Sequence, residues 1–260
     1  MQRYYFLIFF ISIAFISTAI FPIQNSRNIN LLILSGNRNH EWDITTPFLK
    51  QMYEKSGVFS VEVNNRLDTL NYLFLSEFDV ILDNWNEWPE RNCTWTEEAR
   101  EGLVRFVREG GGLIFVHAAG AACYDWPEFR EMAMATWGEK TKHGKIEPIN
   151  VSISDKQHPV TNGVQDFRIT DELWVETEMM DEYQLLCKAF SPKENNGRDQ
   201  MEPVVFFRRY GKGICYYNIL GHDVNAMSNK GWQLLTLRGT QWAAGQKITI
   251  SGKDKIFLQQ

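Results

Sequence analysis

Three of the five histidines in this chain each come shortly after an apolar, strand-like run: His40, His117 and His222. An imidazole titrates near neutral pH, so it can take or give a proton during catalysis, and its neutral form is a common metal ligand. A single histidine in a loop is more often a surface or structural residue. Three in equivalent positions favour a shared catalytic site.

An acidic pair precedes another apolar run, with Glu172 next to the residues 173–175. Acids at such a place often mark only the solvated start of a strand. A glutamate that points into the site instead has three possible roles, as a base, as a metal ligand or as a group that orients a histidine. We therefore place Glu172 with the three histidines as a candidate catalytic residue.

Two tryptophans and two polar residues flank the same apolar runs: Trp42, Asn84, Trp85 and Asp223. An indole offers a flat apolar face that suits a sugar ring, although Trp42 and Trp85 could equally be hydrophobic lids. These four residues form the predicted substrate-binding set.

The sharp turn after the fourth apolar run carries His117 and then Ala118-Ala119-Gly120, with no Ser or Cys. Many α/β enzymes place an activated nucleophile at this turn, so a Cys–His amidotransferase or protease mechanism is disfavoured. Cys123 lies several residues further on, where a thiol is expected to pack in the interior.

The sequence leaves the cofactor open. A divalent metal such as zinc is compatible with His40, His117 and His222, but no HExxH motif gives compact ligand spacing. The glycines 110–112 precede a strand instead of following one, and no GxGxxG follows the first strand, so no nucleotide cofactor is expected.

Strands and helices alternate in the first half of the chain, which predicts a mostly parallel sheet. The expected strands there are 30–35, 58–63, 78–82 and 113–116, with a helix from about Thr45 and another capped by Thr96. Later strand-like runs cover 146–153, 173–177, 184–189, 203–208 and 214–220, and 231–244 reads as a closing helix. Ligands of such sheets bind beyond the carboxyl ends of the strands, where the three histidines fall.

The first 21 residues have the pattern of a targeting segment. An apolar run follows Arg3 and ends before Pro22, as in a secretory signal peptide or an uncleaved N-terminal anchor. We therefore expect an exported protein, periplasmic or extracellular, with a membrane tether if the segment is retained. The main domain is expected at 28–247 and a C-terminal tail at 248–260.

Export permits disulfides, but the wide spacing of the four cysteines contains no CxxC, so a structural zinc site is not supported. The sequence leaves any pairing open, and Cys187 and Cys215 fall in apolar runs that favour buried free thiols. With 260 residues, 44% hydrophobic content and a net charge of −5, the chain is a folded protein without a basic block. A dedicated nucleic-acid binder is therefore not expected, and the oligomeric state stays open.

The order and spacing of several motifs resemble the trehalose-utilisation (ThuA-like) family over about 30–245. The motifs are Leu31–Gly36 with Asn39–Trp42, Phe106–Ala119, His158–Gly163, Asp171–Trp174, Gly211–Gly213 with Leu220–Asp223, and Gly239–Gly245. The resemblance implies a three-layer α/β, flavodoxin-like fold related to class I glutamine amidotransferases, without their Cys nucleophile. It also implies a role in sugar catabolism, in a family that often occurs with dehydrogenases that make 3-keto-glycosides. Its recurrent site positions map onto His40, His117, Glu172 and His222.

Three functions remain open at this point. The first is an enzyme, a lyase or hydrolase, that acts on a glycoside or 3-keto-glycoside by His/Glu acid–base chemistry. The second is a non-catalytic carbohydrate-binding protein with a degenerate amidotransferase-like fold. The third is a hydrolase with paired carboxylates such as Asp83 and Glu172. Convergence of the three histidines on Glu172 in one pocket would favour the first.

Overall fold

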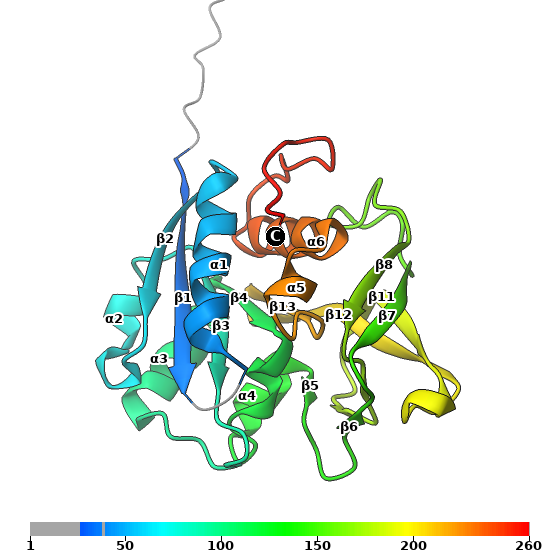
Figure 1. The fold of residues 1–260 in the computed structure, drawn as a ribbon. Coiled ribbons are helices and arrows are strands. Elements are labelled where there is room, and N and C mark those ends of the chain that lie inside the picture. The colour runs from blue at the N-terminus through cyan, green and yellow to red at the C-terminus, as the bar shows by residue number, and fades with distance from the viewer. Residues whose placement is uncertain (1–26, 38–39, 260) are drawn as a thin grey trace, which may run out of the picture.

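A nine-stranded sheet with the order β2-β1-β3-β4-β13-β12-β11-β7-β8 forms the centre of the molecule (Figure 1). The computed structural model describes residues 27–37 and 40–259, so the predicted signal or anchor segment, 1–21, lies outside the described residues. Within the described ranges, no helix combines the length and the apolar character that crossing a membrane requires.

Five parallel strands make up one half of the sheet. They are β1 (Ile29–Asn37), β2 (Phe59–Asn64), β3 (Val80–Asn86), β4 (Gly112–Val116) and β13 (Gly213–Asn218). The inner strands are apolar almost throughout because helices cover both faces, and all five residues of β4 are buried. The carboxyl ends of these strands lie at one edge of the sheet.

Antiparallel strands make up the other half. They are β12 (Gln200–Tyr210), β11 (Gln184–Ser191), β7 (Glu147–Ile153) and β8 (Phe167–Asp171). Each successive pairing reverses the chain direction, so four reversals from β13 give β8 the same direction as the parallel strands. The carboxyl end of β8 therefore reaches the same edge of the sheet as the ends of β1, β3, β4 and β13.

The helices cover the two faces of the sheet and close two apolar cores. One core includes α1 (Trp42–Lys55) and α6 (Lys230–Ala243), through buried residues such as Leu49 and Leu235. The other includes α3 (Glu97–Glu109) and α4 (Pro127–Ala133), through residues such as Phe106 and Phe129. The predicted three-layer α/β fold is confirmed, with a mixed central sheet between the two helical layers (Figure 1).

Short elements complete the chain. They are η1 (Leu67–Thr69), α2 (Tyr72–Leu75), η2 (His117–Ala121), β5 (Ala135–Thr136), β6 (Lys142–His143), β9 (Trp174–Val175), β10 (Glu178–Met179), η3 (Lys193–Asn195) and α5 (Val224–Met227). The pairs β5–β10 and β6–β9 form two small separate sheets. The second of these places His143 opposite Trp174.

Several boundaries differ from the sequence-based expectations. Helix α1 begins at Trp42, so Pro47 lies inside the helix instead of in its first turn. Strand β3 runs on to Asn86 because it stays paired with β1 there, which leaves Asp83 inside the strand. The strand expected over 173–177 shrinks to Trp174–Val175, and the unexpected β8 precedes it.

Other local predictions are confirmed. The Thr96 hydroxyl accepts a hydrogen bond from the backbone N–H of Ala99 and so caps α3. Strands β12 and β13 form the expected antiparallel pair.

The segment after α6 packs back on that helix, where the side chain of Gln233 exchanges two hydrogen bonds with the backbone of Leu258 at 2.8 Å and 2.9 Å.

Candidate functional site

Four side chains from distant parts of the chain meet at the carboxyl edge of the sheet: His40, His117, Glu172 and His222. One nitrogen or oxygen atom from each lies within 4.8 Å of those from all the others. His40 follows β1, His117 follows β4, Glu172 follows β8 and His222 follows β13. The convergence expected from the strand-end positions is therefore observed.

His117 is fixed by the backbone around it. It is the first residue of η2, with a positive φ of 38° that turns the chain sharply after β4. Its Nδ1 lies 2.8 Å from the carbonyl oxygen of Ile219, and a carbonyl only accepts, so Nδ1 carries a proton. The other ring nitrogen, Nε2, then faces His222 Nδ1 at 3.2 Å.

Asp171 holds the backbone of the neighbouring residues. Its carboxylate accepts backbone N–H groups from Gly221 at 2.6 Å, Glu172 at 2.9 Å and His222 at 3.2 Å. Burial raises the pKa of Asp171 to about 6, while the nearby His117 and these hydrogen bonds act in the opposite direction. The side chain joins the end of β8 to the turn after β13 and so sets the positions of Glu172 and His222.

Glu172 is the centre of the cluster. Its Oε1 lies 3.3 Å from His117 Nε2, and its Oε2 lies 3.3 Å from His222 Nδ1 and 3.2 Å from His143 Nδ1. The indole N–H of Trp174 donates to Oε1 at 2.9 Å. Burial by itself would raise the pKa of Glu172, but hydrogen bonds from His117 and His222 lower it far below its ordinary value. Glu172 is therefore an anion.

The histidines differ in protonation. Burial, together with the neighbouring His117 and His222, lowers the pKa of His40 to about 3, so His40 is neutral near pH 7. The hydrogen bond that His222 donates to Glu172 raises the pKa of His222, although burial opposes this shift. The site thus combines a neutral imidazole, an imidazole whose protonated form is stabilised, and one carboxylate. Groups of these kinds carry out general acid–base catalysis.

A pocket of about 330 Å³ opens onto this cluster. Its lining combines three of the four converging residues with aromatic side chains: His40, Trp88, Ala121, Trp137, His143, Glu172, Trp174 and His222. The Trp137 ring lies edge-on to Trp174, with 4.8 Å between ring centroids, and 5.5 Å from Trp88. The pocket therefore has an indole wall facing its titratable groups.

The four predicted substrate-binding residues lie outside the set that lines this pocket. The Asn84 amide donates to the hydroxyls of Thr45 and Thr46 on α1. The Trp85 indole donates to Glu87, and Asp223 caps α5. Trp42 is the half-buried first residue of α1. Strand β3 extends further than predicted, so Asn84 and Trp85 are strand residues and not part of a rim loop.

Asp83 does not supply a second carboxylate to the pocket. It is 1% exposed inside β3, where its Oδ1 accepts the backbone N–H of Trp85 at 2.9 Å. The paired-carboxylate hydrolase suggested as a third function therefore lacks its partner for Glu172 in the residues that line the pocket.

The predicted site set leaves out the aromatic and titratable pocket residues Trp88, Trp137, His143 and Trp174. Trp174 is two residues after Glu172, and this closeness to a predicted site residue could have identified it. The others depend on the pairing of β6 with β9 and on loop packing, which no local pattern encodes. Asn86, at the end of β3, was also missed, and its amide lies 2.9 Å from His40 Nδ1.

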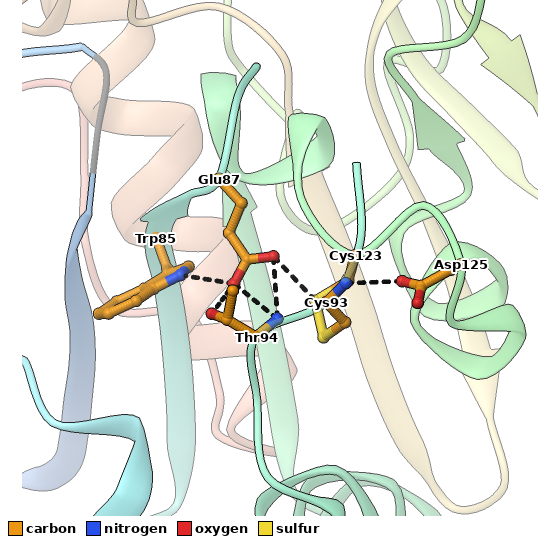
Figure 2. Close-up of a disulfide and its surroundings, with 6 residues drawn as sticks. All are labelled: Trp85, Glu87, Cys93, Thr94, Cys123 and Asp125. Atoms are coloured by element: carbon orange, nitrogen blue, oxygen red, sulfur yellow. Dashed lines mark hydrogen bonds between the residues drawn. A yellow bond between two sulfur atoms is a disulfide. The ribbon is translucent and has the colours of Figure 1, made fainter. Parts of the chain in front are cut away.

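A disulfide joins Cys93 and Cys123 beside the pocket wall (Figure 2). The expectation that Cys123 is a packed free thiol is therefore wrong, whereas Cys187 and Cys215 are buried free thiols as predicted. The disulfide ties the segment after Trp88 to the segment after Ala121, and both residues line the pocket. The two cysteines are 30 residues apart in the sequence, and the packing of their two loops against each other determines this pairing.

Buried hydrogen bonds brace the same segment (Figure 2). The fully buried carboxylate of Glu87 accepts from the Trp85 indole at 3.2 Å and from the backbone N–H of Thr94 at 3.1 Å. The Thr94 hydroxyl donates to the same carboxylate, and Asp125 accepts the backbone N–H of Cys93 at 2.6 Å. The segment next to the pocket residue Trp88 is thus held by covalent and polar contacts.

Several known proteins are similar to this chain. The profile of the ThuA family, described as trehalose utilisation, matches residues 30–243. A ThuA-like protein of Parabacteroides merdae is 28% identical, with a TM-score of 0.77 over 86% of this chain and 93% of that chain. A ThuA-like protein of Bacteroides uniformis is 19% identical, with a TM-score of 0.63 over 85% of this chain and 95% of that one.

A more distant likeness concerns the fold alone. A β-galactosidase of Rahnella sp. R3 is 14% identical, with a TM-score of 0.55 over 86% of this chain and 32% of the other. No curated protein matches the chain. The match to the family profile spans most of the chain, and the chain belongs to the ThuA family of trehalose utilisation.

Proposed function

We propose that the protein is an enzyme of carbohydrate utilisation that cleaves a glycoside or 3-keto-glycoside by His/Glu acid–base chemistry. The observation that carries the proposal is the contact of three imidazoles, those of His117, His143 and His222, with the single carboxylate of Glu172 at 3.2–3.3 Å. The pocket that holds them has an indole wall suited to a sugar ring. Membership of a trehalose-utilisation family supports the substrate class.

The chemistry needs no nucleophile and no added redox reagent. A ketone at C3 makes the C2 hydrogen acidic. A base removes that proton, a C1–C2 double bond forms, and the C1–O bond breaks. An acid protonates the leaving oxygen, so the products are an unsaturated keto-sugar and an alcohol.

The site offers groups for both proton transfers. The carboxylate of Glu172 lines the pocket and can accept the C2 proton. His222 and His143 each place Nδ1 within 3.3 Å of Glu172 and can supply a proton to the leaving oxygen. The Glu172 anion stabilises the imidazolium form of the donor.

The proposed location is outside the cytoplasm. The apolar N-terminal run after Arg3 supports export, and the Cys93–Cys123 disulfide is of a kind that persists in oxidising compartments. The proposed partner is a small carbohydrate. If the N-terminal segment is retained, it would also tether the protein to a membrane.

The test incubates the purified protein with a panel of glycosides and their 3-keto derivatives and follows release of the alcohol. Release from 3-keto substrates alone, with a new enone absorbance, supports elimination. Release from unmodified glycosides supports hydrolysis, in which water adds at C1. Binding of the sugars without turnover of any of them overturns the enzyme proposal in favour of a carbohydrate-binding protein.

A further inference from the structure

We propose that His117 Nε2, His222 Nδ1 and one carboxylate oxygen of Glu172 bind a single divalent transition-metal ion at the base of the pocket. The inference rests on the same site as the proposed function and specifies how that site would hold a substrate oxygen. It is tested by metal binding in the absence of sugar, so its failure and the failure of the proposed function are distinguishable.

The first argument is the buried contact between His117 and Glu172. The carbonyl of Ile219 accepts the Nδ1 proton of His117, so Nε2 is the ring nitrogen that is left to bind a proton or a metal ion. This Nε2 lies 3.3 Å from Glu172 Oε1. A ring nitrogen and a carboxylate oxygen repel each other at this distance unless a proton or a cation lies between them. The side chains of His117 and Glu172 are 3% and 5% exposed, so bulk water does little to weaken the repulsion.

The second argument is the spacing of the donor atoms. His117 Nε2 lies 3.2 Å from His222 Nδ1. His117 Nε2 lies 3.3 Å from Glu172 Oε1, and His222 Nδ1 lies 3.3 Å from the other oxygen, Oε2. In a tetrahedral site with bonds of about 2.0 Å, ligand atoms are about 3.3 Å apart. The two nitrogens therefore already have the separation of two ligands of a zinc tetrahedron, and each has a carboxylate oxygen of Glu172 at the same separation.

The third argument is the outer layer of hydrogen bonds. Metal-binding histidines usually donate their second ring N–H to a carbonyl or carboxylate, and metal-binding carboxylates are hydrogen-bonded in turn. His117 donates Nδ1–H to Ile219, and Trp174 donates to Glu172 Oε1 at 2.9 Å. Asp171 anchors the backbone of His222. The side chains of His117 and Glu172 are thus each held by a hydrogen bond outside the proposed ligand contacts, and His222 is held through its backbone.

His40 is assigned to the open fourth position and not to the ligand set. The Asn86 side-chain oxygen accepts the backbone N–H of Trp88 at 2.7 Å, so its NH₂ group points at His40 Nδ1. Neutral His40 then carries its proton on Nε2, where it can donate to a bound oxygen but cannot bind a metal. A site with three protein ligands and an open position is typical of catalytic zinc.

The donor set indicates the class of metal. Two imidazole nitrogens and one carboxylate oxygen suit Zn²⁺, Co²⁺ or Mn²⁺ better than soft-ligand Cu⁺ or oxygen-preferring Mg²⁺. The ion would bind and polarise a ketone or hydroxyl oxygen of the sugar. With His222 engaged as a ligand, His143 is the remaining imidazole beside Glu172 that can protonate the leaving oxygen.

The test uses the untagged full chain after chelator treatment. Isothermal titration with ZnCl₂ should give one site per chain, and Co²⁺ should give the visible absorption of a tetrahedral centre. His117→Ala and Glu172→Gln should each weaken Zn²⁺ binding at least 100-fold, whereas His40→Ala should keep it within about tenfold. His158→Ala is the matched control, because His158 packs on Phe207 and Trp242 instead of in the pocket.

Circular dichroism and the melting temperature establish that each variant is folded, and Glu172→Gln provides a second ligand variant if His117→Ala does not fold. Absence of a stoichiometric site in the wild-type chain overturns the proposal and leaves a proton between His117 and Glu172. Equal weakening in His117→Ala and His158→Ala overturns it as well, since the ion would then bind elsewhere. A large loss in His40→Ala overturns the assignment of the open position.

Discussion

The carboxylate of Asp171 accepts the backbone N–H of Gly221 at 2.6 Å, and this bond joins two turns that are 50 residues apart in the chain. The same carboxylate accepts the N–H of His222 and of Glu172. Both proposed ligands on this side of the pocket therefore depend on one buried acid that does not itself line the pocket.

Asp171→Asn should test this positioning role. The amide NH₂ must replace one oxygen that now accepts an N–H, so one hydrogen bond is lost and two donors face each other. We expect a loss of roughly 1–3 kcal/mol in the free energy of unfolding, measured by urea denaturation. We also expect 10- to 100-fold weaker Zn²⁺ binding, in the range seen when an outer-layer partner is changed. Unchanged Zn²⁺ affinity in the destabilised variant would show a purely structural role.

His117→Ala should abolish turnover while leaving the fold intact. His117 is buried at the centre of the cluster and contacts both Glu172 and His222. Because His117 contacts Glu172 and is a proposed metal ligand, we expect its removal to lower the rate by at least about 100-fold. Alcohol release from the best substrate, with circular dichroism as the check on folding, measures the effect. A fully active variant would remove His117 from the mechanism.

Trp88→Ala should weaken sugar binding. Trp88 is 36% exposed, lines the pocket and packs near Trp137, so its ring is available to a substrate. Loss of an aromatic contact of about 0.5–1.5 kcal/mol predicts a roughly 2- to 12-fold rise in KM, with a smaller change in kcat. Trp42→Ala is the comparison, because Trp42 does not line the pocket. An equal rise in KM for both variants would contradict the assignment of the indole wall.

Removal of the disulfide should destabilise the protein. Cys93 and Cys123 close a loop with a sequence separation of 30, for which chain entropy predicts about 3–4 kcal/mol. The double variant Cys93→Ala/Cys123→Ala should show this loss in urea denaturation. Wild-type protein treated with reductant should lose a similar amount, and the double variant should not respond to reductant. A double variant as stable as the wild type would contradict the prediction.

Asp83→Asn should stabilise the protein at higher pH. Burial raises the pKa of Asp83 from the ordinary 3.8 to about 8, and its Oδ2 has no hydrogen-bond partner in the described part of the chain. The native state therefore keeps a proton that the unfolded state loses above about pH 4, so this group lowers the wild-type stability progressively from about pH 4 to pH 8. Asn mimics the protonated form and avoids this loss.

The measurement is the difference in unfolding free energy between Asp83→Asn and the wild type at pH 5 and pH 8. The difference should grow in favour of the variant by up to roughly 4 kcal/mol between pH 5 and pH 8. Using the difference cancels the contribution of the other titrating groups. A difference that is the same at both pH values would show that Asp83 is ionised throughout.

The sequence by itself determined most of the elements that carry the site. Apolar runs such as Leu31–Leu34 and Leu113–Val116 form buried strands, because a strand that is covered by helices on both faces needs apolar side chains on both faces. Thr96 caps its helix through a bond three residues away, which is a local interaction that sequence spacing encodes. The placement of His40, His117 and His222 after parallel strands fixed the edge of the sheet to which they belong.

Tertiary structure decided which other groups join those histidines. The direction of β8 depends on four successive pairings across the sheet, and that direction delivers Glu172 to the pocket. The pairing of β6 with β9 delivers His143, and loop packing delivers Trp88 and the Cys93–Cys123 disulfide. Such contacts join residues far apart in the chain, and no local propensity or spacing specifies them. The predicted Trp42 and Trp85 stayed outside the pocket for the same reason, because strand pairing and helix packing determine where those rings lie.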